Sequence, residues 1–458
     1  MDTIADRVGG KRRIIGGPFG SNLTQKDYVS HGVPVIRGTN MEHHGRWIGG
    51  EFVFVSDDKA RNLKANVARP GDIVVTQRGT LGQVSIIPDD LGHALYIISQ
   101  SQMAIAIDDE CADPLFVYYF LRSQTFNEYV GNTTIQTGVP HINLGILRDA
   151  PAIWPSLSEQ QEIAKVLGSL DDQIELNRRM NETLEAIAQA IFRDWFVDFG
   201  PTRRKLDGAT DLVEIMGGLL PDGERARSLA DLFPAKLGDA GLPEGWRDTT
   251  LGTVAKDFGG TIQTGPFGSQ LHQSDYTVSG NPVVMPANLT YSGFREGDFS
   301  YVSSQTTERL SKHRLDLGDI VYGRRGDIGR KALIGKNNAG WLCGTGCLKL
   351  SFPSKAIPPE YLYYWLDQQN TVDWIRSRAI GATMPNLNTS TLGELPLLSP
   401  PYPTLLAFEE IVKDLLALQE ENDQQNRTLA ATRDLLLPQL MSGEICLAEA
   451  EGLLEAAQ

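Results

Sequence analysis

The sequence predicts an α+β protein in which two tandem α/β domains are separated by two long antiparallel coiled-coil helices, related as a pseudo-two-fold internal repeat. Three observations support this fold class. The 458-residue chain repeats itself once, each copy opens with short β-rich segments, and each copy closes with a long heptad pattern. At about 150 residues per domain, the length alone allows about three units.

The internal repeat is clearest in a glycine-rich segment. Residues Gly17–Tyr28 read GPFGSNLTQKDY and residues Gly265–Tyr276 read GPFGSQLHQSDY, so nine of twelve positions agree. The period far exceeds the 20–50 residues of solenoid repeats, which indicates a duplicated unit. Further matching pairs are GDIVVTQRGTLGQ from Gly71 with GDIVYGRRGDIGR from Gly318, PLFVYYFL from Pro114 with PEYLYYWL from Pro359, TGVPHINLGIL from Thr137 with ATMPNLNTSTL from Ala382, and the Asn-x-Thr-Leu-x-Ala motifs at Asn181 and Asn426.

Each copy has the same predicted order of elements. In the first copy, β-branched residues between Gly, Pro and Asn predict strands, a short aromatic helix follows, and a Pro-rich hinge precedes the long helix. Ser158 and Gln161 resemble a capping box and predict that the long helix begins there. The predicted strands are Val33–Ile36, Phe52–Val55, Asp72–Thr76 and Gln83–Ile87, and the aromatic helices are Leu115–Leu121 and Tyr361–Leu366.

The long helices carry seams of heptad spacing, which favour a coiled coil over a single amphipathic helix on a globular core. We expect the two seams to pair antiparallel, which would place Asn177 and Asn181 near Asn422 and Gln425. These amides either hydrogen-bond each other and fix the register or lie in a wet gap. The seams are Ile163, Leu167, Leu170, Ile174, Asn177, Asn181, Leu184, Ala188, Ile191 and Trp195, and Ile411, Leu415, Leu418, Asn422, Gln425, Leu429, Thr432 and Leu436.

Charge is distributed unevenly along the chain, whose net charge is −15. Residues 158–245 carry 10 Lys and Arg against 17 Asp and Glu, and residues 401–458 carry 3 against 11. The remaining segments, 1–157 and 246–400, are close to neutral, and a neutral domain can present a basic face. The global charge therefore does not exclude nucleic acid as a partner.

Composition bounds the cell compartment and the chemistry. No apolar run approaches the roughly 18–20 residues that span a bilayer, and no secretory signal is visible, so we expect a cytoplasmic protein without a membrane partner. Cys343 and Cys347 lack zinc-ligand spacing, and we expect no metal site. No phosphate-binding loop is present, and the Gly344–Gly346 and Gly323–Gly329 segments are poor matches to nucleotide-binding motifs, so we expect no catalytic residues.

The repeat order resembles the specificity (S) subunit of Type I restriction–modification enzymes. Ser156–Pro201 is similar to the central conserved region of that family, Leu242–Val254 to the opening of its second target-recognition domain, and Leu435–Ile445 to its terminal signature. The first domain departs from the pattern, because its opening TIADRVGG lacks the Trp-containing lead-in that precedes Thr253. The resemblance covers essentially the whole chain.

The resemblance implies a division of the chain into recognition and spacer parts. Residues 1–157 would form target-recognition domain 1, 158–200 the central long helix, 201–245 a connector, 246–402 target-recognition domain 2, and 403–458 the distal long helix and tail. Each recognition domain would read one half of a bipartite target in double-stranded DNA. The helices would space the halves and dock two methyltransferase (M) subunits, with restriction/translocase (R) subunits joining through the complex.

Three repeated polar loops are the candidate DNA contacts. Their glycines could admit a phosphate, arginine suits phosphate or guanine, and amides suit adenine. The alternatives are a tight turn, a hairpin with solvated arginine, and amides that only cap a turn. The candidate residues are Ser21, Asn22, Lys26, Arg78, Thr80, Gln136, His141, Asn143, Ser269, Gln270, His272, Arg324, Arg325, Arg330, Asn386 and Asn388. The copies differ at several of these positions, which suggests an asymmetric target.

Two other functions compete with this interpretation: a self-contained two-headed DNA-binding regulator, and an enzyme with an unrecognised active site. The resemblance instead implies a non-catalytic subunit that binds no cofactor itself. S-adenosylmethionine, ATP and Mg would then be bound by the partner subunits.

Overall fold

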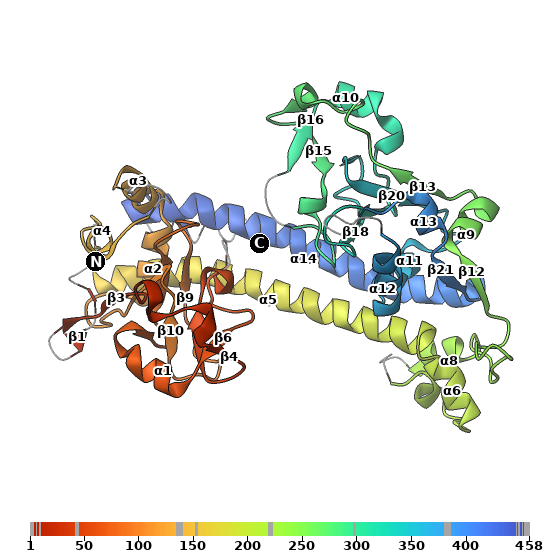
Figure 1. Ribbon diagram of the computed structural model, residues 1–458, viewed down its shortest axis with the longest axis horizontal. Helices are drawn as coiled ribbons and strands as arrows, with labels where there is room; N and C mark the ends of the chain where they lie inside the picture. The colour runs from red at the N-terminus through yellow and green to blue at the C-terminus, as the bar shows by residue number, and fades with distance from the viewer. Residues whose placement is uncertain are drawn as a thin grey trace. The chain divides into compact units, whose positions relative to one another are not determined.

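The computed structural model describes residues 4–5, 7–8, 11–41, 45–133, 141–151, 154–218, 223–295, 299–379, 386–445, 447, 449–450 and 452. Unit 1 comprises Met1–Arg178 together with Asp423–Gln458, and unit 2 comprises Arg179–Asn422. Each long helix therefore begins in one unit and ends in the other (Figure 1). Among the described residues, no helix combines the length and the apolar character needed to cross a membrane.

The globular part of unit 1 contains two main sheets. In the first, β11 lies between β3 and β8, and all neighbours are antiparallel. In the second, β5 and β10 are the parallel pair. The strand order of the first sheet is β3 (Ile14–Gly16), β11 (Gln102–Ile105), β8 (Ile73–Thr76), β9 (Val84–Ile86). The order of the second is β4 (Tyr28–Val29), β6 (Val53–Val55), β5 (Val33–Ile36), β10 (Tyr96–Ile98), β7 (Val67–Ala68). A separate pair is formed by β1 (Arg7–Val8) and β2 (Lys11–Arg12).

The four strands predicted in the first copy are confirmed to within one residue at each end, as is its aromatic helix. This helix, α2, begins with Pro114 behind the N-cap Asp113, whose carboxylate accepts from the Phe116 N–H. Its aromatic residues are buried in one core with the first sheet and the long helices. The helices of this part are α1 (Asp57–Asn62), α2 (Pro114–Arg122), α3 (Gln124–Thr133) and α4 (Leu144–Arg148), and the 3-10 turns are Gly20–Asn22, Gln25–Asp27, Gly38–Asn40 and Lys64–Asn66.

The globular part of unit 2 repeats this plan. One sheet is antiparallel throughout, and the other contains the parallel pair β15 and β19. The strand order of the first is β13 (Thr261–Thr264), β20 (Cys347–Ser351), β17 (Ile320–Gly323), β18 (Lys331–Leu333). The order of the second is β14 (Tyr276–Thr277), β16 (Ser300–Val302), β15 (Asn281–Val284), β19 (Leu342–Cys343). A separate pair is formed by β12 (Arg247–Thr250) and β21 (Pro396–Ser399). Helices are α9 (Leu251–Phe258), α10 (Ser304–Arg309), α11 (Pro359–Trp365), α12 (Gln369–Arg378) and α13 (Thr389–Gly393), with 3-10 turns at Gln273–Asp275, Pro286–Asn288 and Ser311–His313.

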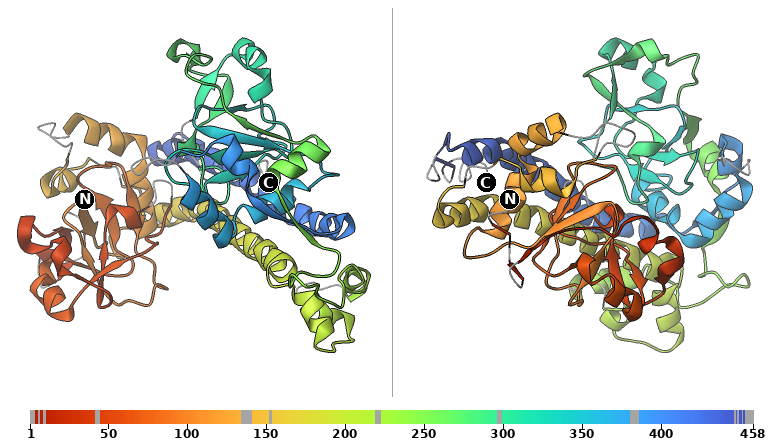
Figure 2. Two further views of the ribbon diagram at one scale, coloured as in Figure 1. Left: turned by 45° about the vertical axis from the view of Figure 1, so that its right-hand side comes forward. Right: turned by 60° about the vertical axis from the view of Figure 1, so that its left-hand side comes forward.

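The predicted connector at 201–245 is folded. It holds α6 (Gly200–Leu206), α7 (Leu212–Ile215) and α8 (Gly223–Ala230), which lie at the end of α5 in the left view of Figure 2. Arg204 forms a two-pronged ion pair with Asp194 of α5, with N–O distances of 2.9 and 2.7 Å. Apolar residues of this segment join the core around Trp195, so the connector is part of unit 2.

The two long helices are α5 (Leu157–Phe196) and α14 (Tyr402–Ser442). The prediction that Ser158 caps α5 is wrong. Ser156 is the capping residue: its hydroxyl accepts from the Glu159 N–H, while the Glu159 carboxylate accepts from the Ser156 N–H and hydroxyl. The serine and the acid needed for a capping box both lie two residues earlier than the pair chosen from the sequence.

In unit 1 the first half of α5 and the second half of α14 lie side by side, antiparallel (Figure 1). Asn177 donates to the side-chain oxygens of Gln425, at 2.8 Å, and Asn426, at 3.0 Å. Asn177 and Asn426 are both buried, whereas Gln425 is exposed. The amides therefore hydrogen-bond one another in place of water at this point of the seam.

In unit 2 the remaining halves pair in the same way. Asn422 donates to the side-chain oxygen of Asn181 at 2.8 Å, and Gln419 donates to the Asn181 backbone carbonyl at 2.9 Å. Through the sequence repeat, this Asn422–Asn181 bond corresponds to the Asn177–Asn426 bond of unit 1. The predicted proximity of Asn177 and Asn181 to Asn422 and Gln425 is thus observed, and a role in register stays a prediction.

The seam predicted for α14 is wrong at three positions. Leu418 is 39% exposed, and Gln425 is exposed. The buried positions in the central and distal parts are Asn422, Asn426, Leu429, Arg433, Leu436, Leu437 and Leu440. The true seam thus takes Gln419, Asn426 and Arg433 in place of Leu418, Gln425 and Thr432. Polar residues occupy the buried stripe there, so hydrophobicity alone selects the neighbouring positions.

A buried ion pair joins the helices to the globular part of unit 1. Arg433 of α14 and Asp171 of α5 are 2.6 Å apart, with side chains 5% and 7% exposed. The Tyr119 hydroxyl of α2 donates to the same carboxylate at 2.7 Å. The Asp171 carboxylate raises the pKa of the Arg433 guanidinium against the opposing effect of burial. Three elements thus meet at one carboxylate.

We predict that Arg433→Ala lowers the free energy of unfolding by about 3–5 kcal/mol, because Asp171 is left buried and unpaired. Urea unfolding of the full chain measures this. Arg427→Ala, on an exposed position of the same helix, should change it by less than about 0.5 kcal/mol. The double variant Asp171→Leu/Arg433→Met should recover most of the loss. Equal effects of the two single arginine substitutions would refute the role given to the pair.

Candidate nucleic-acid interface

The three predicted loops occur at equivalent places in both units. We call them loop A (Gly17–Asn22 and Gly265–Gln270), loop B (Gln77–Gly82 and Arg324–Gly329) and loop C, described at 141–143 and 386–388. Gln136, the other candidate of loop C, lies outside the described residues. Loop A follows the edge strand β3 or β13, and loop B follows β8 or β17.

In unit 1 the loops converge on one turn, Ser99–Ser101, which joins β10 to β11. A Cβ on Gly17 would lie 1.9 Å from the Ser99 carbonyl oxygen, so only glycine at position 17 lets loop A pack this closely against the turn. Gln77 of loop B donates from its backbone to Ser101, at 2.8 Å, and from its side chain to the Gln100 carbonyl, at 2.7 Å. Loop C is added through a bridge between Arg78 and His141.

In unit 2 the turn Gly344–Gly346 between β19 and β20 has the same place. A Cβ on Gly265 would lie 2.0 Å from the Gly344 carbonyl oxygen, and Thr345 donates to the Pro266 carbonyl at 2.9 Å. The Arg324 N–H donates to the Gly346 carbonyl at 2.9 Å. A bridge between Arg325 and Asn386 brings in loop C, so one constellation is built twice.

The base of loop A is anchored by an aspartate in each unit. Hydrogen bonds from Lys59 of α1 and from Thr24 lower the pKa of Asp27 to about 2. In unit 2 the backbone of His272 and the guanidinium of Arg309, on α10, hold the pKa of Asp275 below its usual value. These carboxylates remain charged at neutral pH and fix the 3-10 turn behind each loop.

Several candidate residues turn inward and support the loops. The Asn143 and Asn388 side-chain oxygens cap α4 and α13, accepting from Ile146 and Thr391 N–H groups. Gln270 accepts from the Phe267 N–H at 3.1 Å. For these three amide oxygens, the capping or turn alternative describes what the structure shows.

Two arginines of the second unit also have partners within the protein. Arg324 is half-buried and donates to the Asn386 side-chain oxygen at 3.2 Å, and burial lowers the pKa of its guanidinium. Arg330 pairs with Asp327 at 2.9 Å. Hydrogen bonds from Tyr291 and Arg330 lower the pKa of the Asp327 carboxyl, so the pair persists at neutral pH. Neither guanidinium is presented outward like that of Arg325, which is exposed.

The remaining candidates form the outer surface of the loops. Their side chains come from loops A and B and from the 3-10 turn behind loop A, and they differ between the units. Exposed candidates are Ser21, Asn22, Lys26, Arg78 and Thr80 in unit 1, and Ser269, His272 and Arg325 in unit 2, while His141 is half-buried. Their contact with DNA stays a prediction.

Both globular parts of the chain match one known protein family. Residues 21–186 and 243–430 each match the family described as "Type I restriction modification DNA specificity domain". Together the two matches cover well over half of the chain. This chain belongs to the Type I restriction–modification DNA specificity family.

Relatives resemble the specificity protein over nearly its whole length. The HindI specificity subunit of Haemophilus influenzae is 24% identical, covering 94% of this chain and 98% of the relative. The MjaIX specificity subunit of Methanocaldococcus jannaschii is 23% identical, covering 92% and 88%. The S subunit structure from M. genitalium is 16% identical, with a TM-score of 0.49 and coverage of 96% and 94%.

Sequence reasoning missed one feature of loop A in this specificity protein. Phe19 and Phe267 stand at the same repeat position, with 88% and 59% of their surfaces exposed. A phenylalanine between Pro and Gly in both copies was the available signal. The Ser99–Ser101 and Gly344–Gly346 turns were also missed, because their sequences share no pattern that relates them.

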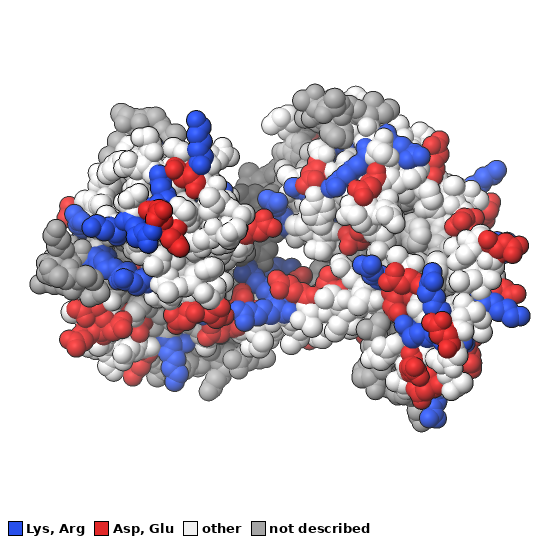
Figure 3. All heavy atoms as spheres, turned by 60° about the horizontal axis from the view of Figure 1, so that its bottom comes forward, with Lys and Arg blue, Asp and Glu red and all other residues white. Residues whose placement is uncertain are grey.

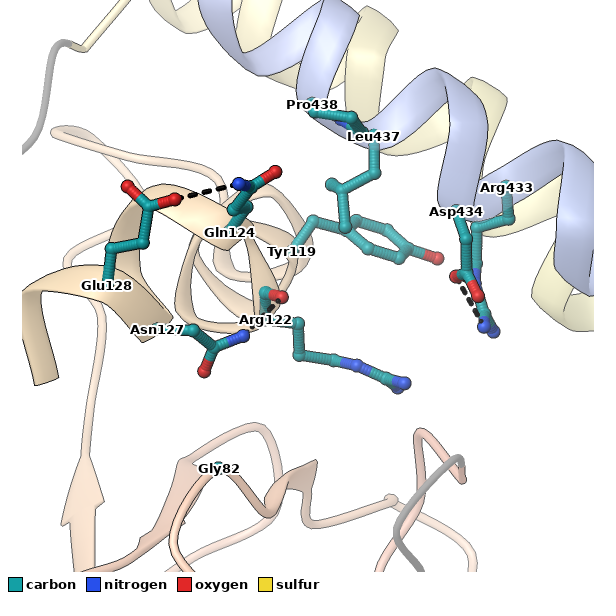
Figure 4. A pocket seen from close by; sticks show the side chains of 10 residues that line it. All are labelled: Gly82, Tyr119, Arg122, Gln124, Asn127, Glu128, Arg433, Asp434, Leu437 and Pro438. Carbon is teal, nitrogen blue, oxygen red and sulfur yellow. Dashed lines mark hydrogen bonds and ion pairs between the residues drawn. The ribbon is translucent and has the colours of Figure 1, made fainter. Parts of the chain in front are cut away.

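A cavity of about 630 Å³ lies beside loop B of unit 1 of the specificity protein (Figure 4). Gly82 borders it below, Arg122 extends into it from α2, and Asp434 of α14 lines another side (Figure 4). Arg122 hydrogen-bonds the Tyr118 hydroxyl. At the repeat-equivalent position in unit 2, Asp367 is bonded to the buried Lys331. The opening is thus lined by both signs of charge.

Charge is mixed on the face of the specificity protein that Figure 3 shows. On the face shown in Figure 3, Lys and Arg alternate with Asp and Glu over both units without forming one basic patch. Among the described residues, no group of three or more His, Cys, Asp or Glu is placed to hold a metal ion. Arg78 and Arg325 are exposed and place positive charge on loop B of each unit.

We predict that Arg325→Ala weakens DNA binding through unit 2 and leaves the preference of unit 1 intact, because each constellation is built within its own unit. Losing one phosphate contact should reduce the slope of log affinity against log salt by about 1, and a lost guanine contact should relax one base position. Salt titration of the assembled complex measures the first effect. Arg247→Ala, an exposed arginine of β12, is the control. Unchanged binding at every salt concentration would remove Arg325 from the interface.

Proposed function

We propose that the chain is the DNA-recognition subunit of a Type I restriction–modification complex in which each globular part reads one half of a bipartite target. The observation that carries this proposal is the duplicated constellation: the same three loops gather on the same turn in both units. Their exposed residues differ, as with Lys26 against Ser274 and Thr80 against Asp327. Equal scaffolds with unequal side chains suit a target with two different halves.

The long helices would serve as spacer and docking surface. Several large apolar side chains on them are exposed: Leu176, Met180, Ile187, Leu418 and Leu435, at 53%, 39%, 40%, 39% and 59%. Exposed apolar residues along a helix favour packing against partner helices. We propose that two methyltransferase subunits bind there and that the restriction/translocase subunits join through them.

The subunit would be non-catalytic. In this proposal it binds DNA and partners, while S-adenosylmethionine, ATP and Mg are bound by the other subunits. Membership of the specificity family does not favour the alternative of a self-contained regulator. The net charge of −15 supports weak DNA binding by the isolated chain, and affinity gained in the complex should fall steeply with salt.

The decisive experiment expresses the methyltransferase partner with and without this chain and maps DNA methylation. We expect methylation at a bipartite target only when the chain is present, and no ATP hydrolysis or methyl transfer by the isolated chain. An unchanged methylation map, or either activity in the isolated chain, would overturn the proposed function.

A second prediction tests the spacer. α5 has 40 residues and α14 has 41, so each helix extends roughly 60 Å at 1.5 Å per residue. Inserting one heptad into each helix, after Arg178 and after Asn422, preserves the phase of the seam and adds about 10 Å. We expect the undefined spacer of the target to lengthen by about three base pairs, at about 3.4 Å each, with both half-sites unchanged.

The control places seven residues between Asp239 and Ala240, in an exposed turn outside the long helices. This variant should methylate the original target. A spacer that stays constant when the helices lengthen, or half-site bases that change, would contradict the spacer role. The readout is the methylation map of each variant.

A further inference from the structure

Two phenylalanines project from loop A without contributing to either core. Phe19 is 88% exposed and Phe267 is 59% exposed, and neither packs in a hydrophobic cluster of the described residues. A large side chain of this kind gains roughly 1.5–3 kcal/mol when it is buried. Neither residue obtains that gain within its own chain, so a partner that covers it would provide a substantial driving force.

The loop holds each ring clear of the protein. Gly17 and Gly265 press the start of the loop against the anchoring turn, whereas Gly20 and Gly268 have no atoms within 4 Å of the place where a Cβ would stand. Behind the ring, the Asn22 and Gln270 N–H groups donate to the Phe19 and Phe267 carbonyls at 2.9 and 2.8 Å. The backbone of the tip is thus ordered while its side chain stays outside.

The arginine of loop B belongs to the same constellation as this apolar tip. Loop A and loop B touch the same anchoring turn, so Phe19 is two residues from a contact with Ser99, and Arg78 is one residue from a contact with Ser101. Unit 2 repeats this arrangement with Phe267 and Arg325 around Gly344–Gly346. An apolar ring and a guanidinium carried by two loops on one anchoring turn fit a partner that offers flat apolar faces and anionic groups together, which is the chemistry of stacked bases on a phosphate backbone.

The two phenylalanines are identical in the two copies, whereas neighbouring residues that could read bases differ. Between the copies, Asn22 becomes Gln270 and Lys26 becomes Ser274, while the phenylalanine is the same. Every base has an apolar face, so a ring that stacks has no need to change when the target sequence changes.

We propose that Phe19 and Phe267 are apolar wedges, each entering a base step of the half-site read by its own unit and partly unstacking it. The inference rests on the proposed function and adds to it a deformation of the DNA. The wedges contribute affinity and favour flexible steps, and the differing residues beside them read the bases.

The test uses the complex of this chain with its methyltransferase subunits and a duplex carrying the mapped target. Variants are Phe19→Ala and Phe267→Ala, each matched by Phe→Trp at the same position. The control is Phe258→Ala, because Phe258 is 50% exposed and precedes β13, whereas Phe267 follows it. Affinity is measured over a salt titration, and 2-aminopurine placed at successive steps of each half-site reports unstacking by its fluorescence.

Each alanine variant should weaken binding by about tenfold, within the range measured for loss of one base–aromatic stack. The slope against salt should stay as in the wild type, because no charge is lost. The fluorescence rise on binding should vanish only in the half-site of the altered unit. Tryptophan at the same position should restore both signals, and Phe258→Ala should match the wild type.

Three results would overturn the wedge. They are wild-type affinity in both alanine variants, a fluorescence rise that persists in them, and loss of assembly with the methyltransferase subunits, which would place the rings in a protein interface. A wild-type complex without sequence preference would sink the proposed function itself. If the wild-type complex shows sequence preference but the alanine variants bind with wild-type affinity, the wedge is refuted and the proposed function is not.

Discussion

The structure depends on the antiparallel pairing of helix halves that come from distant parts of the chain. Each globular part packs on one half of α5 and one half of α14, so neither unit is complete until both long helices have formed. In unit 1 the Asp171 carboxylate links both long helices to the globular part. It accepts hydrogen bonds from Arg433 and Tyr119, and all three side chains are buried. A buried ion pair adds little net stability, but an unpaired partner is costly, so this pair excludes other alignments of the helices.

Paired amides impose a similar constraint further along the seam. The Asn177–Asn426 and Asn181–Asn422 bonds are related by the repeat, and each joins two amide side chains across the seam. A shift of either helix by one turn would set one of the two α5 amides against an apolar residue, either Asn181 against Leu418 or Asn177 against Ala430. Leu170 and Leu429 pack against the seam core, and their burial supplies the stability that polar contacts do not. Apolar residues thus hold the helices together, and we expect the amides and the ion pair to select the alignment.

The sequence predicts this architecture well where a residue's environment follows its hydrophobicity. The first-copy strands, the aromatic helices and the seam of α5 are confirmed because apolar residues there coincide with buried positions. The α14 seam shifts by one residue where Asn426 and Arg433 are buried and Gln419 is half-buried, since their partners on α5 decide their position and no periodicity shows it. For the same reason, duplication located the three loops but could not show that Asn388 caps α13 or that Arg330 pairs with Asp327.

In each loop, the residues that the fold requires are close in sequence to the residues that we expect to contact DNA. Gly17 and Gly265 admit the chain's own carbonyl groups at distances that no side chain would tolerate, so these glycines are required by the fold. Residues a few positions away, such as Asn22 and Lys26, are exposed and meet no such limit. A scaffold anchored from behind by Asp27 and its Lys59 partner can therefore exchange its outer side chains without losing its shape. This separation explains how two copies of one fold, in one chain, can present different surfaces on the same scaffold.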